Sequence, residues 1–198
     1  MAYQNRETKN KNQSHKSKWS RNHTKTTARN YQYSKSLKKI IKKTEKKSLT
    51  KRNLLNLLRH APNFIGVFAS DQLKQCHILH FPTFLIVNLD TSDKSGSHWL
   101  CIRIGARDIE LFDSLGFDPS IWSQYPKNLF LFLSYYSTSH NVLISPVLQA
   151  PNTYICGLFA VYFILYRQNH SFNACIKQFS SRLDLNRYIL FDLLHSLS

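Results

Sequence analysis

The chain has 198 residues, 42% hydrophobic and 13% aromatic, which suits one compact domain with a sizeable core. Its net charge of +16 is unevenly placed, because residues 1–52 hold 17 Lys/Arg against 2 Asp/Glu and residues 53–198 hold 10 against 9. No apolar stretch approaches the roughly 20 residues that cross a bilayer, and the polar N-terminus lacks the apolar run of a secretory signal. We therefore expect a soluble, intracellular monomer with no membrane partner, in which a globular domain (53–198) follows a basic extension (1–52).

The basic extension combines high charge with few large apolar side chains, so we expect it to be disordered in the free protein. Its charge favours a polyanion, DNA above all, as the partner, through contacts that do not depend on base sequence and weaken with salt. A nuclear import signal and a solubilising tail are the alternatives. The densest cluster of candidate DNA contacts comprises Lys38, Lys39, Lys42, Lys43, Lys46 and Lys47.

Residue spacing in the globular part predicts alternating helices and strands. Asn53 is the expected cap of the first helix, and four residues between two apolar runs, 105–108, indicate a β-hairpin. The order of the elements favours an α+β domain. The predicted elements are a helix at 53–58, strands at 64–68, 84–89, 98–104 and 109–112, a helical region at 119–136 interrupted near Pro126, a strand at 142–148, and helices at 156–168, 172–179 and 183–194.

Cys156 begins the longest apolar run of the chain, directly after the polar segment 149–155. If that run is a helix, the thiol lies in its first turn, where unpaired N–H groups and the helix dipole favour the reactive thiolate. Gly157 would let another backbone or a substrate approach closely. The simpler interpretation is an ordinary buried cysteine, because cysteine is among the most buried residue types.

Three further polar residues could complete a site around this thiol. The Gln149 amide could donate a hydrogen bond to an oxyanion, with the backbone N–H of Cys156 as the second donor. His98 opens one strand of the predicted hairpin and Asp113 follows the other, so the two side chains meet if the register permits. Asp113 would then orient the imidazole and favour its charged form. Taken singly, an exposed histidine and a turn aspartate are the simpler interpretations.

These residues lie in three blocks that follow one another along the chain: His98-Trp99, then Leu-Phe-Asp-Ser-Leu-Gly-Phe at 111–117, then Gln-Ala-Pro-Asn-Thr-Tyr-Ile-Cys-Gly-Leu-Phe at 149–159. Together they resemble the adenovirus protease (adenain) family and, more distantly, the SUMO proteases. The resemblance spans about residues 53–165 and implies an α+β, papain-like superfamily fold with a mixed sheet flanked by helices. It also implies a role for each residue: Cys156 as nucleophile, His98 as general base and acid, Asp113 as the orienting acid, and Gln149 as oxyanion donor.

The same resemblance implies a thiol endopeptidase that matures virions by cleaving capsid and core precursors, in the virion and the host nucleus. Adenoviral proteases use DNA and an activating peptide as cofactors; the basic extension suits DNA, but no site for a peptide can be placed. The family usually has glutamate where this chain has Asp113, and the extension is not part of its pattern. These departures favour a relative from an adenovirus-like element, such as a Polinton or adintovirus.

Two other functions stay open. One is a deconjugating protease for ubiquitin-like proteins, although no insertion that would grip a folded modifier is visible in the sequence. The other is an inactive, nucleic-acid-binding virion protein, against which the complete set of four residues argues.

Two smaller features of the sequence bear on the site. Asp118 is a rival for the acid role, although the proline after it indicates a helix cap. Cys76, His77 and His80 have spacing typical of metal ligands, but without a second cluster we expect no zinc. No metal or small-molecule cofactor is therefore expected.

Overall fold

The computed structural model describes residues 48–118, 120 and 125–197. Most of the basic extension, including its six clustered lysines, lies outside these residues, so the expected disorder and DNA contacts stay predictions. In chain order the elements are α2 (Lys51–Leu58), β1 (Phe64–Ala69), the 3-10 helix η1 (Ser70–Gln75), β2 (Thr83–Asn88), β3 (Trp99–Ile104), β4 (Asp108–Phe112), α3 (Lys127–Ser137), β5 (Asn141–Ile144), α4 (Cys156–Arg167), α5 (Phe172–Ile176) and α6 (Leu183–Ser196).

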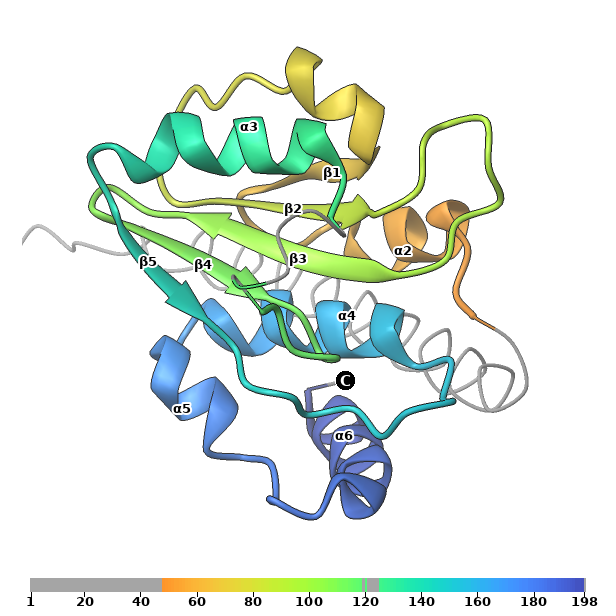
Figure 1. Cartoon of the computed structure of the whole chain (residues 1–198). Helices are drawn as coiled ribbons and strands as arrows, with labels where there is room; N and C mark the ends of the chain where they lie inside the picture. The colour runs from red at the N-terminus through yellow and green to blue at the C-terminus, as the bar shows by residue number, and fades with distance from the viewer. Residues whose placement is uncertain (1–47, 119, 121–124, 198) are drawn as a thin grey trace, which may run out of the picture.

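The five strands form one mixed sheet in the order β1-β2-β3-β4-β5 (Figure 1). The three central strands are antiparallel, and each edge strand is parallel to its neighbour. The predicted hairpin is confirmed, with Cys101 opposite Phe112 and Ile104 opposite Ile109. This mixed sheet with helices packed against it confirms the predicted α+β class.

Helices cover both faces of the sheet, so it separates two apolar clusters (Figure 1). Along β3 successive side chains point to opposite faces. Leu100 and Ile102 join the cluster beneath α3 and η1, whereas Trp99 and Cys101 join the cluster around α4. This double burial explains why the sequence of the central strands is nearly continuously apolar.

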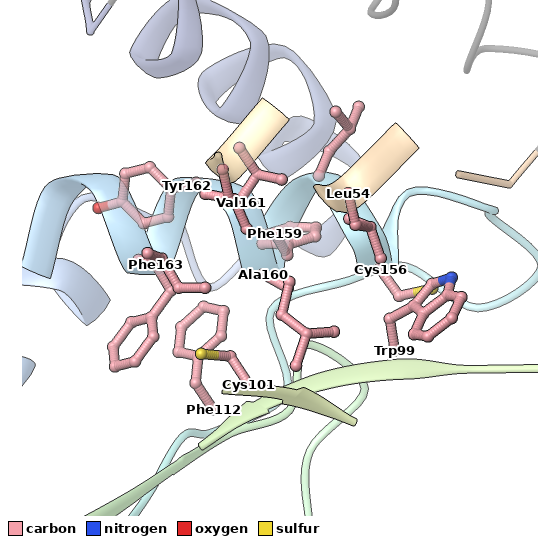
Figure 2. Packing of buried hydrophobic residues seen from close by; sticks show 14 of the residues in the cluster. Leu54, Trp99, Cys101, Phe112, Cys156, Phe159, Ala160, Val161, Tyr162 and Phe163 are labelled. Atoms are coloured by element: carbon pink, nitrogen blue, oxygen red, sulfur yellow. The ribbon is translucent and has the colours of Figure 1, made fainter. Parts of the chain in front are cut away.

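Helix α4 runs between the sheet and the helices α2 and α6, and its residues 156–164 are all buried (Figure 2). A helix that is apolar on every side belongs in a core. Within this stretch the Tyr162 hydroxyl donates to the Cys175 carbonyl at 3.0 Å, so its polar group is paired inside the core. The position of α4 therefore fixes its first residue, Cys156, at one edge of the core.

Several element boundaries differ from the predictions. The helix predicted at 53–58 is α2, which begins at Lys51, because Thr50 caps it and Asn53 supplies the reciprocal half of a capping box. In the region predicted as helical, α3 begins directly after Pro126; residues 119 and 121–124 lie outside the description. The 3-10 helix η1 was not predicted.

The last strand is also shorter than predicted: β5 ends at Ile144, not at residue 148. The chain beyond it turns to bond the segment that follows β4, with the Leu148 and Gln149 N–H groups both donating to the Ser114 carbonyl. In the part of the chain that the structure describes, no helix is long and apolar enough to cross a membrane.

Candidate active site

Cys156 is the first residue of α4 and is 4% exposed. Ile155 is the N-cap residue of the helix, and its apolar side chain makes no capping hydrogen bond to the first turn. The N–H groups of a first helical turn have no partner within the helix, and they carry partial positive charge. The structure therefore places the thiol at a helix N-terminus, as predicted.

His98 and Asp113 form a buried ion pair, with 2.7 Å between Nε2 of the imidazole and Oδ1 of the carboxylate. His98 directly precedes β3 and Asp113 directly follows β4, so the hairpin register brings them to the same end of the hairpin. The same Oδ1 accepts the Leu115 N–H at 2.9 Å, and Ser145 bonds both the N–H and the carbonyl of Asp113. Besides its bond to His98, Asp113 is thus held by three hydrogen bonds, one to its carboxylate and two to its backbone.

The second partner of the imidazole is the side chain of Cys156. Because Nε2 is bonded to Asp113, the remaining ring nitrogen, Nδ1, is the one left for the thiol. Burial alone would lower the pKa of His98, but the hydrogen bonds and charges of Asp113 and Cys156 outweigh it and raise the pKa to about 10. At neutral pH the imidazole of His98 therefore carries a proton. It lies between the Asp113 carboxylate and the Cys156 thiol.

Gln149 is 2% exposed, and both ends of its side-chain amide are hydrogen-bonded. The Ser114 hydroxyl donates to Oε1 at 2.7 Å, and Nε2 donates to the Thr153 carbonyl at 2.8 Å. An amide nitrogen has two hydrogens. One is used by Thr153, and the other is available to a bound group.

Leu49, in the segment in front of α2, packs in the same apolar cluster as Trp99 and Cys156. The indole Nε1 of Trp99 donates to the Leu49 carbonyl at 2.9 Å in a buried bond. A Cβ placed on Gly157 would lie 3.1 Å from the Cβ of Leu49 and 3.4 Å from a methyl group of Leu54. Gly157 therefore admits a neighbouring segment of the same chain, whereas the sequence left open whether backbone or substrate would use the space.

Two hollows border the site. One, of about 190 Å³, is lined by Trp99, Asn88 and the loop after β2, and the other, of about 270 Å³, by Gln149, Thr153 and residues of α6. A larger hollow of about 490 Å³ lies between η1 and α3 and involves none of the four predicted residues. The site thus has open space on both its Trp99 and its Gln149 sides.

The structure pairs His98 with Asp113, and the side chain of Cys156 acts on the same imidazole. Gln149 is tied to Ser114, which directly follows Asp113. The rival acid does not take part, because Asp118 is exposed and its carboxylate accepts the N–H of Ser120. Within the described residues no group of three His, Cys, Asp or Glu side chains is arranged to hold a metal ion.

Sequence reasoning missed the serines that brace the site. Ser114 lies inside the block 111–117, so its place next to Asp113 was a signal that could have been used. Ser145 carried no such signal, because its contact with Asp113 depends on the path of the chain after β5.

Comparison with known proteins gives no family assignment: no family model and no curated protein matches the chain. Among solved structures, the central domain of the uncharacterized Lpg1148 protein from Legionella pneumophila is 12% identical, with a TM-score of 0.43, and the alignment covers 76% of this chain and 97% of that one. The SUMO protease Ulp1 with its catalytic cysteine oxidized to a sulfenic acid is 14% identical, with a TM-score of 0.38 and coverage of 84% and 96%. The sulfonic acid form of Ulp1 is 16% identical, with a TM-score of 0.37 and coverage of 77% and 81%. Scores this low assign the chain neither a family nor a substrate.

Proposed function

We propose that this protein is a cysteine endopeptidase with Cys156 as its nucleophile. The observation that carries the proposal is the buried line Asp113–His98–Cys156, in which the thiol stands at the start of α4. A nucleophile, a base within reach of it and a third group that orients the base are the parts that covalent catalysis of acyl transfer requires.

In the first half of the reaction, the Cys156 thiolate attacks the carbonyl carbon of the scissile peptide, forming an S–C bond. The carbonyl π electrons move to the oxygen, where Nε2 of Gln149 and the N–H of Cys156 donate hydrogen bonds to the oxyanion. The C–N bond then breaks, and the proton already held on His98 passes to the leaving amine.

In the second half, a water molecule attacks the thioester while His98 accepts its proton. The carboxylic acid leaves, and the thiolate and imidazolium are restored. Asp113 keeps its charge throughout and holds the ring so that Nδ1 faces the sulfur.

An experiment that does not need the natural substrate tests this proposal. The full chain is treated with the p-nitrophenyl ester of acetylglycine, and release of p-nitrophenol is followed together with the mass of the acylated peptide. We expect acylation on Cys156 and turnover that is lost in Cys156→Ala, but kept in Cys76→Ala, which removes a half-buried thiol outside the site. Equal turnover in wild type and Cys156→Ala would remove the proposal.

For the substrate we propose precursor proteins of a virion, cleaved beside small residues in the virion or the host nucleus. The three sequence blocks that resemble the adenovirus proteases support this choice, and the hollows on both sides of the site offer room for chain on either side of a scissile bond. Cleavage of glycine-containing peptides, with no cleavage of a panel of ubiquitin-like fusions, is the expected result. The reverse pattern would identify a deconjugating protease instead.

We propose further that DNA holds the protease near its substrates through the lysine cluster at 38–47. The support is compositional: residues 1–52 carry a net charge of +15, whereas the rest of the chain is almost neutral. Cleavage of a precursor should rise with added DNA at low salt and lose this gain at high salt. The rate is measured with and without DNA, at low and at high salt. Equal rates in all four conditions would contradict a DNA cofactor, and so would an unchanged rate increase by DNA when the six lysines are replaced by glutamine. An activating peptide, if one is used, would raise the rate with or without DNA.

A further inference from the structure

Ser114 has no part in the proposed reaction, yet it is 1% exposed and contacts Gln149 in two ways. Its hydroxyl donates to Oε1 of Gln149 at 2.7 Å, and its carbonyl accepts the backbone N–H of Gln149 at 2.7 Å. Ser114 also directly follows Asp113, which holds the imidazole. One dipeptide at the end of β4 thus reaches both the base and the predicted oxyanion donor.

The chemistry of the amide explains what the hydroxyl does. A glutamine amide has an oxygen that only accepts and a nitrogen that only donates, and exchanging them changes the group presented to the substrate. Here Oε1 faces a hydroxyl donor and Nε2 faces the Thr153 carbonyl, an acceptor. Turning the amide over would set Oε1 against that carbonyl, so Ser114 and Thr153 together define one orientation.

We propose that Ser114 is a positioning residue, whose hydroxyl holds the Gln149 amide with its free N–H presented to the oxyanion. This inference rests on the proposed function and adds to it the element that sets the geometry of the oxyanion site. Because donors of this kind act only when they are already aimed at the developing charge, a loosely held amide would contribute less than a fixed one.

The alternative is that the Ser114 hydroxyl only satisfies a buried group and supports the fold. Two reactions of the same thiol separate these roles. Acylation by the p-nitrophenyl ester of acetylglycine passes through a tetrahedral oxyanion, whereas alkylation by iodoacetamide displaces iodide and forms none. A residue that acts through Gln149 should affect the first reaction and spare the second.

The experiment measures both rate constants in the full chain for wild type, Ser114→Ala, Gln149→Ala and the double variant. We expect Ser114→Ala to slow acylation about tenfold or more, but by no more than the 10²–10³-fold that loss of an oxyanion donor typically causes. Alkylation of Cys156 should stay within about twofold. Binding of acetylglycinal, whose adduct with the thiol carries the same oxygen, should weaken in parallel with acylation.

The double variant is the decisive arm. If Ser114 acts through Gln149, removing the hydroxyl after the amide is gone should cost nothing further, so the double variant should match Gln149→Ala. Losses that multiply, or a Ser114→Ala variant that slows alkylation as much as acylation, would overturn the inference. Ser70→Ala is the matched control, because Ser70 is equally buried and its hydroxyl has no hydrogen-bond partner among the described residues. It should change neither rate.

Failure of this inference can be told apart from failure of the proposed function. If wild type shows no turnover that depends on Cys156, the proposed function is wrong. If wild type turns over the ester but Ser114→Ala equals it, the function stands and the positioning role does not. Thermal unfolding of each variant shows whether it is folded under the conditions of the assay.

Discussion

The β3–β4 hairpin carries a buried cluster of acidic and basic side chains at each end. At the turn end, Glu110 is fully buried and bonded by Arg103 at 3.0 Å and by Arg167, from α4, at 2.7 Å. At the site end, His98 and Asp113 pair at 2.7 Å beside the thiol of Cys156. Both clusters connect the hairpin to α4, one to each end of that helix.

The two clusters differ in whether they can exchange protons. A guanidinium stays protonated at any pH that the fold survives, so the turn end is a fixed arrangement of charge. Burial raises the pKa of Glu110, against the opposing influence of the Arg167 and Arg103 guanidiniums. An imidazole between a carboxylate and a thiol can instead give and take a proton. The comparison shows that burial and ion pairing alone do not identify an active site; the residue types do.

The strongest way to break the comparison is to change Asp113 to asparagine. We expect kcat/KM for the ester to fall about 10²–10⁴-fold, the usual contribution of acid–base catalysis, because the amide cannot hold the imidazolium as the carboxylate does. The matched control is Asp118→Asn, at an exposed carboxylate that faces Ser120, and it should keep full activity. Equal losses in the two variants would show that the acid has been wrongly assigned.

The turn end should respond in stability rather than in chemistry. Arg167→Met leaves Glu110 with one guanidinium, and breaking a buried pair in this way typically costs about 3–5 kcal/mol of the free energy of unfolding. Adding Glu110→Leu should restore much of this loss, because the uncompensated charge is then gone. Denaturant unfolding of both variants measures the effect. Asp184→Ala, in the exposed pair with Arg182, is the control and should change little. A single variant as stable as wild type would contradict this description of the cluster.

The site end should also depend on close packing. Gly157→Ala places a methyl group against Leu49, and we expect a loss of about 1–3 kcal/mol in the free energy of unfolding, as for other overpacked cores. Leu49→Ala in the same chain should relieve the contact. The stability lost in the double variant should therefore be smaller than the sum of the losses in the two single variants. Strictly additive losses would mean that the methyl group meets some other obstacle.

A further test of the site end concerns the pH dependence of stability. His98 has a folded-state pKa of about 10 against an ordinary value of 6.5, so the folded protein keeps a proton that the unfolded chain releases between those values. Stability from this group is complete below about pH 6.5 and is lost as the pH rises toward 10. In His98→Gln the decline in the free energy of unfolding over this range should be flatter, whereas exposed His60→Gln should follow wild type. Parallel curves for wild type and His98→Gln would contradict the raised pKa.

The sequence determined a large part of this protein by itself. Local spacing was enough to place the central hairpin, the long helix after Pro151 and the cysteine at its start, because periodicity and turn residues act over a few positions. It also supplied all four candidate site residues, since they lie at the ends of those elements, where the pattern changes from apolar to polar.

Only the tertiary structure decided how these residues are held. The contact between His98 and Asp113 followed from the register of β3 and β4, and the roles of Ser114 and Ser145 followed from the path of the chain after β5. Such contacts join residues about 15 to 35 positions apart. They depend on how both faces of the sheet are packed, and local propensity carries no information on that. The residue types of the candidate site could be predicted from the sequence, whereas their geometry depends on the packing around them.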